Sequence, residues 1–186
     1  MHSPFLELVN RRRSIRSYLD TPVERDKIVA CIEASRLAPS ACNSQPWKFI
    51  VVDEPELKRQ VAAATSNSAL PLNHFTNQAP VLVVLIMEGA NMTATIGSVI
   101  KHKQLPLIDI GIAAEHFCLE ATDLGLGTCM LGWFNEKKIQ KLLGIGAPGR
   151  PVLIITLGYP AESKERVKTR KALESIMAWN GYTGHN

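Results

Sequence analysis

The chain has 186 residues, of which 46% are hydrophobic and 20% charged, with a formal net charge of +4 at pH 7. This composition is typical of one globular domain rather than of a disordered or membrane protein. No apolar run reaches the ~18 residues of a membrane-spanning helix, and +4 is too small an excess to indicate nucleic-acid binding by itself.

Apolar periodicity and turn residues predict the secondary structure along the chain. In chain order we expect a helix at 4–12, a helix at 23–38, a strand at 47–53, a helix at 54–67, a strand at 80–87, a helix at 107–124, a helix at 136–144 and a strand at 150–160. Ser3 is the candidate N-cap of the first helix, with Pro4 at its first position. Buried strands alternating with helices predict a layered α/β or α+β sandwich.

The helix at 107–124 is apolar around most of its circumference. At about 100° per residue, its polar side chains fall in a stripe about 60° wide, formed by Asp109, His116, Glu120 and Asp123. A helix packed on one sheet needs an apolar face only about 100° wide. We therefore expect two packing partners and infer a homodimer with this helix at its interface; complete burial within its own domain is the alternative.

Basic residues gather near both ends of the chain. Four arginines lie at 11, 12, 13 and 16, and a second basic group lies at 164, 166, 168, 170 and 171. A basic stretch alone is more often a solvated surface than a binding site. Two such clusters, distant in sequence, can instead converge on one anion.

The cysteines and histidines lack the spacing of metal ligands, so we expect no metal site. Cys31, Cys42, Cys118 and Cys129 form no CxxC pair. The N-terminus does not have the charge order or cleavage site of a signal peptide, so we expect a cytoplasmic protein whose cysteines are reduced, small core residues.

One glycine motif matches a dinucleotide-binding pattern in the wrong context. The residues GIGAPG at 144–149 fit GxGxxG, which requires a strand before it and a helix after it. Here a helix precedes the motif and a strand follows it. We therefore predict a C-cap glycine and a turn.

A polar, proline-bounded turn at 39–46 connects the second helix to the first strand. Its side chains form hydrogen bonds readily, and its prolines restrict the backbone. Such a turn can hydrogen-bond a planar ligand, although an ordinary helix-to-strand connection has the same composition.

Five motifs occur in order between Leu6 and Tyr182: RRRSIRSY, APSACNSQPWKF, DIGIAAEHFCLEATDLGLGTCMLGWF, LGYP and KTRKALESIMAWNGY. Together they resemble the nitroreductase family of flavin mononucleotide (FMN) enzymes. The resemblance implies one domain over 1–186, folded as an α+β, three-layer α-β-α sandwich with a mainly antiparallel central sheet. It also implies an intertwined homodimer with two FMN sites at the subunit interface.

The resemblance also implies a set of cofactor-binding residues. Those expected at the phosphate end are Arg12, Arg13, Ser14, Arg16, Lys168 and Arg170. Ser14 and its neighbours two positions away point to one side if this segment is extended. Arg16 has a second implied role near the flavin pyrimidine edge, where positive charge stabilises the reduced ring.

Three further segments are expected to approach the flavin ring. The turn that reaches it from the other subunit corresponds to Pro39, Ser40, Ala41 and Asn43, where Ala41 replaces a serine that the family often has. The stretch beside the ring corresponds to Met130, Leu131 and Gly132, with the Gly132 N–H expected to donate to flavin N5. Asn73 is expected at the pyrimidine edge.

The implied reaction is hydride transfer from NADH or NADPH to FMN, followed by reduction of a nitroaromatic, quinone, flavin or enone acceptor. The flavin carries this chemistry, so no catalytic side chain is expected. Residues 88–106 correspond to a variable cover over the flavin, and residues 171–186 to a C-terminal extension.

Other functions remain open from the sequence. A flavin sensor or storage protein would bind FMN without useful turnover, and a dehalogenating or flavin-fragmenting relative would use the same site. A nucleic-acid-binding module could use the basic ends, but these have neither interleaved aromatic residues nor a helix-turn-helix pattern.

Overall fold

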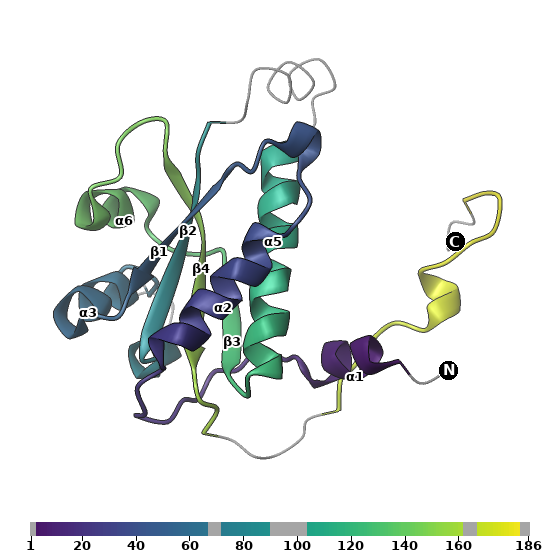
Figure 1. Cartoon of the computed structure of the whole chain (residues 1–186), viewed down its shortest axis with the longest axis horizontal. Coiled ribbons are helices and arrows are strands. Elements are labelled where there is room, and N and C mark those ends of the chain that lie inside the picture. Colours follow the sequence, from purple (N-terminus) through teal and green to yellow (C-terminus); the bar gives the residue numbers. More distant parts are fainter. Residues whose placement is uncertain (1–2, 67–71, 90–103, 162–166, 183–186) are drawn as a thin grey trace.

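The computed structural model describes residues 3–66, 72–89, 104–161 and 167–182 (Figure 1). Its elements are α1 (Pro4–Arg11), α2 (Arg25–Arg36), η1 (Ala41–Asn43), β1 (Trp47–Val52), α3 (Pro55–Ala63), η2 (His74–Gln78), β2 (Val81–Met87), α5 (Leu105–Asp123), β3 (Gly127–Leu131), α6 (Glu136–Leu143), β4 (Arg150–Gly158) and η3 (Leu173–Ser175). The predicted helices and strands are confirmed, with bounds that differ by a few residues. The sequence reading did not assign β3, which is only five residues long.

The described strands form one antiparallel sheet in the order β1-β2-β4-β3. The central strand β2 is apolar on both faces, because both faces are covered. Leu82, Val84 and Ile86 contribute to one core cluster. Val81, Val83 and Leu85 contribute to the other.

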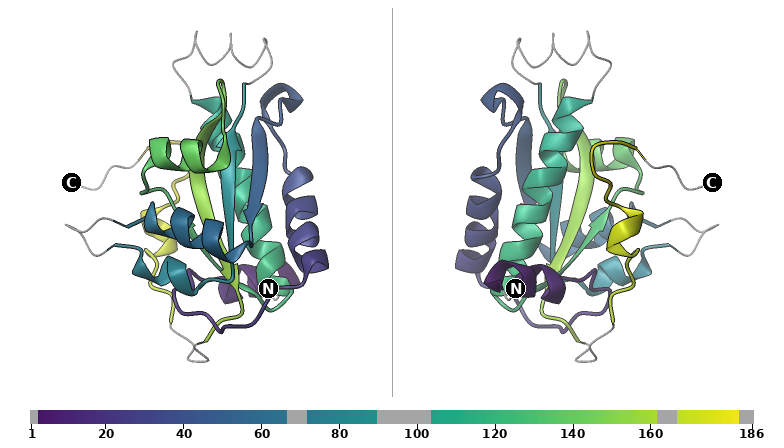
Figure 2. Two further views of the ribbon diagram at one scale, coloured as in Figure 1. Left: turned by 90° about the vertical axis from the view of Figure 1, so that its left-hand side faces the viewer. Right: turned by 90° about the vertical axis from the view of Figure 1, so that its right-hand side faces the viewer.

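The two clusters separate three layers. Helices α3 and α6 cover one face of the sheet, and α2 and α5 cover the opposite face (Figures 1 and 2). Val61 and Ile139 anchor the first pair of helices, whereas Cys31 and Phe117 anchor the second; all four are fully buried. The predicted α-β-α sandwich with an antiparallel sheet is therefore confirmed.

Helix α5 has a second packing partner within its own chain, since it packs on α2 as well as on the sheet. One member of the polar stripe contacts this neighbour: His116 Nδ1 lies 3.2 Å from the Ala34 carbonyl oxygen. Helix α2 therefore covers part of the apolar circumference of α5 without a second subunit. Ile108 nevertheless remains 56% exposed, so the described residues leave one apolar part of α5 uncovered.

The GIGAPG segment is a helix end and a turn, as expected. Helix α6 ends at Leu143, and Gly144 follows in the left-handed conformation with φ 63°. Its N–H bonds the Gln140 carbonyl oxygen, and β4 begins at Arg150. No helix N-terminus is presented here to a pyrophosphate.

The C-terminal segment 167–182 runs beside α1 and extends away from the three layers (Figure 1). Its apolar side chains are largely exposed, including Val167, Leu173, Ile176, Trp179 and Tyr182. Of the expected cover at 88–106, residues 90–103 lie outside the described part of the chain. In the described ranges, no helix combines the length and apolarity required to cross a bilayer.

Candidate functional site

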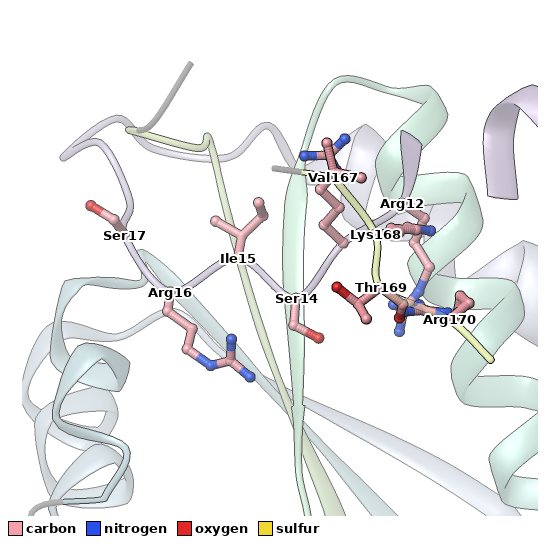
Figure 3. A pocket seen from close by; sticks show the side chains of 10 residues that line it. Arg12, Ser14, Ile15, Arg16, Ser17, Val167, Lys168, Thr169 and Arg170 are labelled. Carbon is pink, nitrogen blue, oxygen red and sulfur yellow. The ribbon is translucent and has the colours of Figure 1, made fainter. Parts of the chain in front are cut away.

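The two basic segments meet at one cavity of about 400 Å³. It is lined by Arg12, Arg13, Ser14, Ile15, Arg16, Ser17, Val167, Lys168, Thr169 and Arg170. All six residues expected at the phosphate end are among them. Figure 3 shows Lys168 and Arg170 on the strip that faces the Arg12–Ser17 segment.

The Arg12–Ser17 segment lies along the edge of the sheet beside β3. Ser14 pairs with Thr128 in an isolated parallel bridge, and the Ile15 N–H donates to the Thr128 carbonyl oxygen at 2.8 Å. The contact is close because Gly127 has no side chain: a Cβ there would lie 2.7 Å from Ile15 Cγ1.

Successive side chains of the Arg12–Ser17 segment point to opposite sides, as expected for an extended backbone. Ser14 and Arg16 point to one side, whereas Ile15 and Ser17 point to the other (Figure 3). Arg16 lies at one end of the cavity, and Lys168 and Arg170 lie at the other (Figure 3). The site therefore offers a cationic cluster and a separate cation some distance from it.

Two consecutive arginines, the last residue of α1 and the first of this segment, lie beside carboxylates of α5. Arg11 Nη2 lies 2.8 Å from an oxygen of Asp123, an exposed pair. Arg12 Nε lies 3.1 Å from an oxygen of Glu115, but the geometry is not that of a hydrogen bond, and this buried nitrogen has no hydrogen-bond partner. A buried N–H without an acceptor is costly, so Arg12 is oriented by a carboxylate yet retains an unsatisfied donor.

Like charges crowd the Lys168 end of the cavity. Burial lowers the pKa of the Lys168 ammonium, and the neighbouring guanidinium groups, Arg170 first among them, lower it further. Lys168 Nζ donates to the Val9 carbonyl oxygen, and Arg170 Nη1 donates to the Thr169 carbonyl oxygen at 2.8 Å. These partners are neutral, so the net positive charge of the cluster remains available to an anion.

The turn at 39–46 has an unusual backbone. Cys42, Asn43 and Gln45 have φ values of 53°, 51° and 46°, in the left-handed region, which costs a non-glycine residue about 1–2 kcal/mol. The Gln45 N–H donates to Ser40 Oγ at 2.9 Å. The Ala41 N–H points at the carboxylate of Asp109, with both oxygens 3.2 Å from the nitrogen.

The turn and the cavity lie on different faces of α5. Asp109 contacts the turn and Glu115 contacts Arg12, and six residues of α-helix correspond to about 9 Å of rise and about 120° of rotation. Pro39, Ser40, Ala41 and Asn43 do not line the cavity. Within one chain, the two sets of predicted site residues are therefore not brought together.

Asn73 lies beside the end of β3. Its Nδ2 donates to the Thr65 carbonyl oxygen at 3.1 Å and to the Trp133 carbonyl oxygen at 3.2 Å, and its backbone is left-handed with φ 61°. Leu131 is buried, and Gly132 follows the strand with no atom within 4 Å of the position of a Cβ. The sequence-distant Asn73 is thus placed next to the Met130–Gly132 stretch.

The prediction that all four cysteines are core residues is wrong for Cys42. It is exposed, because the turn that carries it projects from the core, whereas Cys31, Cys118 and Cys129 are buried. Burial raises the pKa of the Cys129 thiol, against the opposing effects of nearby Arg16 and Ser14.

Sequence reasoning missed the carboxylates that position these segments. In the sequence, Glu115 lies outside the polar stripe of the helix, and Asp109 is only one of the four members of that stripe. Neither has a motif of its own. A charged residue at an otherwise apolar helical position was the available signal, because such residues are rarely buried without a partner.

Comparisons with protein families and with curated proteins show what this chain is similar to. The model of the Nitroreductase family matches residues 9–159. A protein named NADH dehydrogenase/NAD(P)H nitroreductase from Archaeoglobus fulgidus is 32% identical over 86% of this chain and 87% of its own length. An FMN reductase [NAD(P)H] of Bacillus subtilis is 27% identical over 88% of this chain and 68% of its own. Iodotyrosine deiodinase of Drosophila melanogaster is also 27% identical, over 92% of this chain and 68% of its own length.

Solved structures agree with these relatives. A nitroreductase family protein from Clostridium novyi NT has a TM-score of 0.73 and 34% identity, covering 87% of both chains. An FMN-dependent nitroreductase from Clostridium difficile R20291 has a TM-score of 0.79 and 26% identity, covering 95% of this chain and 99% of its own. With this fold, this arrangement of basic residues and a family match over most of its length, the chain belongs to the Nitroreductase family.

Proposed function

We propose that this protein binds FMN and transfers hydride from NADH or NADPH to a small acceptor. The enzyme class, an NAD(P)H-dependent oxidoreductase, follows from the family and from the activities in the names of its relatives. The cofactor and the residues that hold it are our own assignment. They rest on the cavity between the two basic segments.

The observation that carries the proposal is the buried Arg12 Nε without a hydrogen-bond partner, beside a lysine whose pKa is lowered by burial and by surrounding cations. A phosphate dianion supplies acceptors and charge to both groups. Hydrogen bonds to charged groups contribute about 1.5–3 kcal/mol each. Arg12, Lys168 and Arg170, with the Ser14 hydroxyl, fit the phosphate of FMN.

Other residues would hold the rest of the cofactor. Arg16, at the far end of the cavity from Arg170, is assigned to the flavin pyrimidine edge, where a fixed positive charge favours the reduced ring. Asn73 and the Gly132 N–H are assigned to the ring because both lie at the end of β3. When bound, FMN supplies the hydride-transfer chemistry itself. The protein supplies position and charge.

A homodimer completes this assignment. The turn at 39–46 lies on a different face of α5 from the cavity of its own chain, so a second copy would have to supply the turn to each flavin. Apolar side chains that the described part of the chain leaves exposed support the same inference, notably Ile108 on α5 and Trp179 in the C-terminal segment. Sedimentation equilibrium of the full chain at micromolar concentration tests it: a monomer contradicts the dimer.

The reaction is tested by the absorption spectrum of the purified protein. We expect the bands of oxidised flavin, and we expect NADH or NADPH to bleach them under anaerobic conditions. Adding a nitroaromatic or a quinone to the bleached protein should restore the bands. A protein that keeps its flavin oxidised with both nucleotides would be a binding or storage protein instead.

Reductive dehalogenation is a second candidate, because iodotyrosine deiodinase of Drosophila melanogaster is among the relatives. It would use the same flavin site with a halogenated aromatic acceptor. Incubating the reduced protein with iodotyrosine and measuring released iodide tests it. Absence of iodide, with rapid reduction of nitroaromatics, would assign the protein to the nitroreductase activity.

A further inference from the structure

Asp109 is a buried carboxylate, and no described cation lies beside it. It is 5% exposed, and among the described residues no other Asp, Glu, Lys or Arg side chain is classed as buried. Within these same ranges, no Lys, Arg or His nitrogen lies within 4 Å of its oxygens. A buried charge needs strong hydrogen bonds to persist, so the groups that face Asp109 indicate its role.

The group that faces it is the backbone of the turn. Both carboxylate oxygens lie 3.2 Å from the Ala41 nitrogen, so one N–H is shared between two acceptors. Ala41 is the first residue of η1, directly before Cys42 and Asn43, whose φ values are positive. The hydrogen bond therefore joins α5 to the strained part of the turn.

The strained backbone of the turn indicates that the hydrogen bond between Ala41 and Asp109 does more than pack the turn on α5. Left-handed conformations at non-glycine residues persist only where the surroundings impose them, and they concentrate at ligand sites. Bonds within the turn, such as Ser44 N–H to the Ala41 carbonyl oxygen at 3.0 Å, fix its shape. The Asp109 contact fixes its location relative to α5.

We infer that Asp109 is the positioning residue that holds the turn in place for the flavin ring. The inference rests on the proposed flavin site. Asp109 acts through the Ala41 N–H and does not itself touch the cofactor. Its effect should therefore fall on binding of the ring system and leave binding of the phosphate unchanged.

The substitution Asp109→Asn tests this with little change in shape. The amide keeps one acceptor but places a donor where the second oxygen lies, opposite the Ala41 N–H. Titrating the apoprotein with FMN and with riboflavin, which lacks the phosphate, should show both dissociation constants raised by the same factor, about tenfold. Arg12→Met should instead weaken FMN binding and leave riboflavin binding within twofold. Glu120→Gln, on the same helix, is the control.

A second variant removes the other half of the contact. Ala41→Pro deletes the N–H that Asp109 accepts; Ser40 before it is already extended (φ −145°, ψ 154°), as a residue preceding proline prefers. Ala41→Pro should raise the dissociation constants of FMN and riboflavin by the same factor as Asp109→Asn. The double variant Asp109→Asn/Ala41→Pro should bind both ligands no more weakly than either single variant. The labelling rate of the exposed Cys42 thiol reports the location of the turn without any flavin, and both variants should change it.

The outcomes separate the two proposals. If the wild-type protein binds neither FMN nor riboflavin, the proposed flavin site is wrong. If it binds both, but Asp109→Asn leaves both dissociation constants and the Cys42 labelling rate within twofold of wild type, the inference about Asp109 is wrong. It is also wrong if only FMN binding weakens. If Asp109→Asn fails to fold, the Ala41→Pro titrations decide by the same criteria.

Discussion

The hydroxyl of Tyr18 lies 2.6 Å from Oγ1 of Thr156, joining residues 138 positions apart. The same hydroxyl donates to the Ile15 carbonyl oxygen at 2.8 Å, and Thr156 Oγ1 accepts from the Cys129 N–H at 3.1 Å. This buried network attaches the Arg12–Ser17 segment to β4 and β3. The location of the cationic cavity therefore depends on groups that do not line it.

Tyr18→Phe should reduce both stability and flavin affinity. The change leaves Thr156 with a lost partner in the core, which costs about 1–3 kcal/mol in the free energy of unfolding. Chemical denaturation and an FMN titration measure the two effects. Tyr159→Phe is the matched control, since its hydroxyl bonds the exposed Glu24; equal losses in both variants would contradict the role of the buried network.

Gly127→Ala should displace the same segment from the opposite side. A Cβ at 127 would lie 2.7 Å from Ile15 Cγ1 and 2.9 Å from Ile15 Cβ, so the Ile15 backbone must move. Overpacking of this kind costs about 1–3 kcal/mol, and FMN affinity should fall with it. At Gly146 a Cβ meets nothing within 4 Å, so Gly146→Ala should affect neither quantity.

The charge of Lys168 should make the stability of the apoprotein depend on pH. Its folded-state pKa is lowered below the ordinary value of a lysine, so between these two values the unfolded chain binds more protons. Stability therefore rises with pH across that window. The melting temperature of wild type minus that of Lys168→Met should increase from pH 7 to pH 10. A constant difference would contradict the crowding of cations around Lys168.

The thiols should react in a fixed order. Burial raises the pKa of Cys31 to about 12 and that of Cys118 to about 11, so both should resist a thiol reagent at pH 8. Cys42 is exposed and should react first. If the turn approaches the flavin as proposed, saturating FMN should slow the labelling of Cys42; mass spectrometry of the labelled peptide identifies the site.

The sequence predicted most helices and strands of this fold but not its shortest strand. Strand β2 could be assigned from its continuous apolar run, and α5 from its length and its apolar residues, because each pattern by itself indicates burial. The short strand β3 could not, because five residues carry too little pattern and its burial comes from β4. The pairing of β3 with β4 depends on contacts between residues distant in the sequence, which no local pattern reveals.

Only part of the candidate site could likewise be recognised from the sequence. The clustered basic residues indicated a possible shared anion site, and in the structure Arg12 and Lys168 line one cavity. The carboxylates that orient the site could not be recognised, since Asp109 and Glu115 act through three-dimensional neighbours in another part of the chain. Likewise, the strain at Cys42 becomes visible only in the backbone angles.

The central claim is that the two basic segments bind one flavin phosphate, and the double variant Arg12→Met/Arg170→Met tests it most directly. Fluorescence titration of the apoprotein should show FMN affinity reduced at least about 100-fold, from the loss of two charge-assisted contacts, with riboflavin affinity within twofold of wild type. Arg36→Met/Arg59→Met, which removes two exposed ion pairs on other helices, is the control. An unchanged affinity of the double variant for FMN would contradict the account.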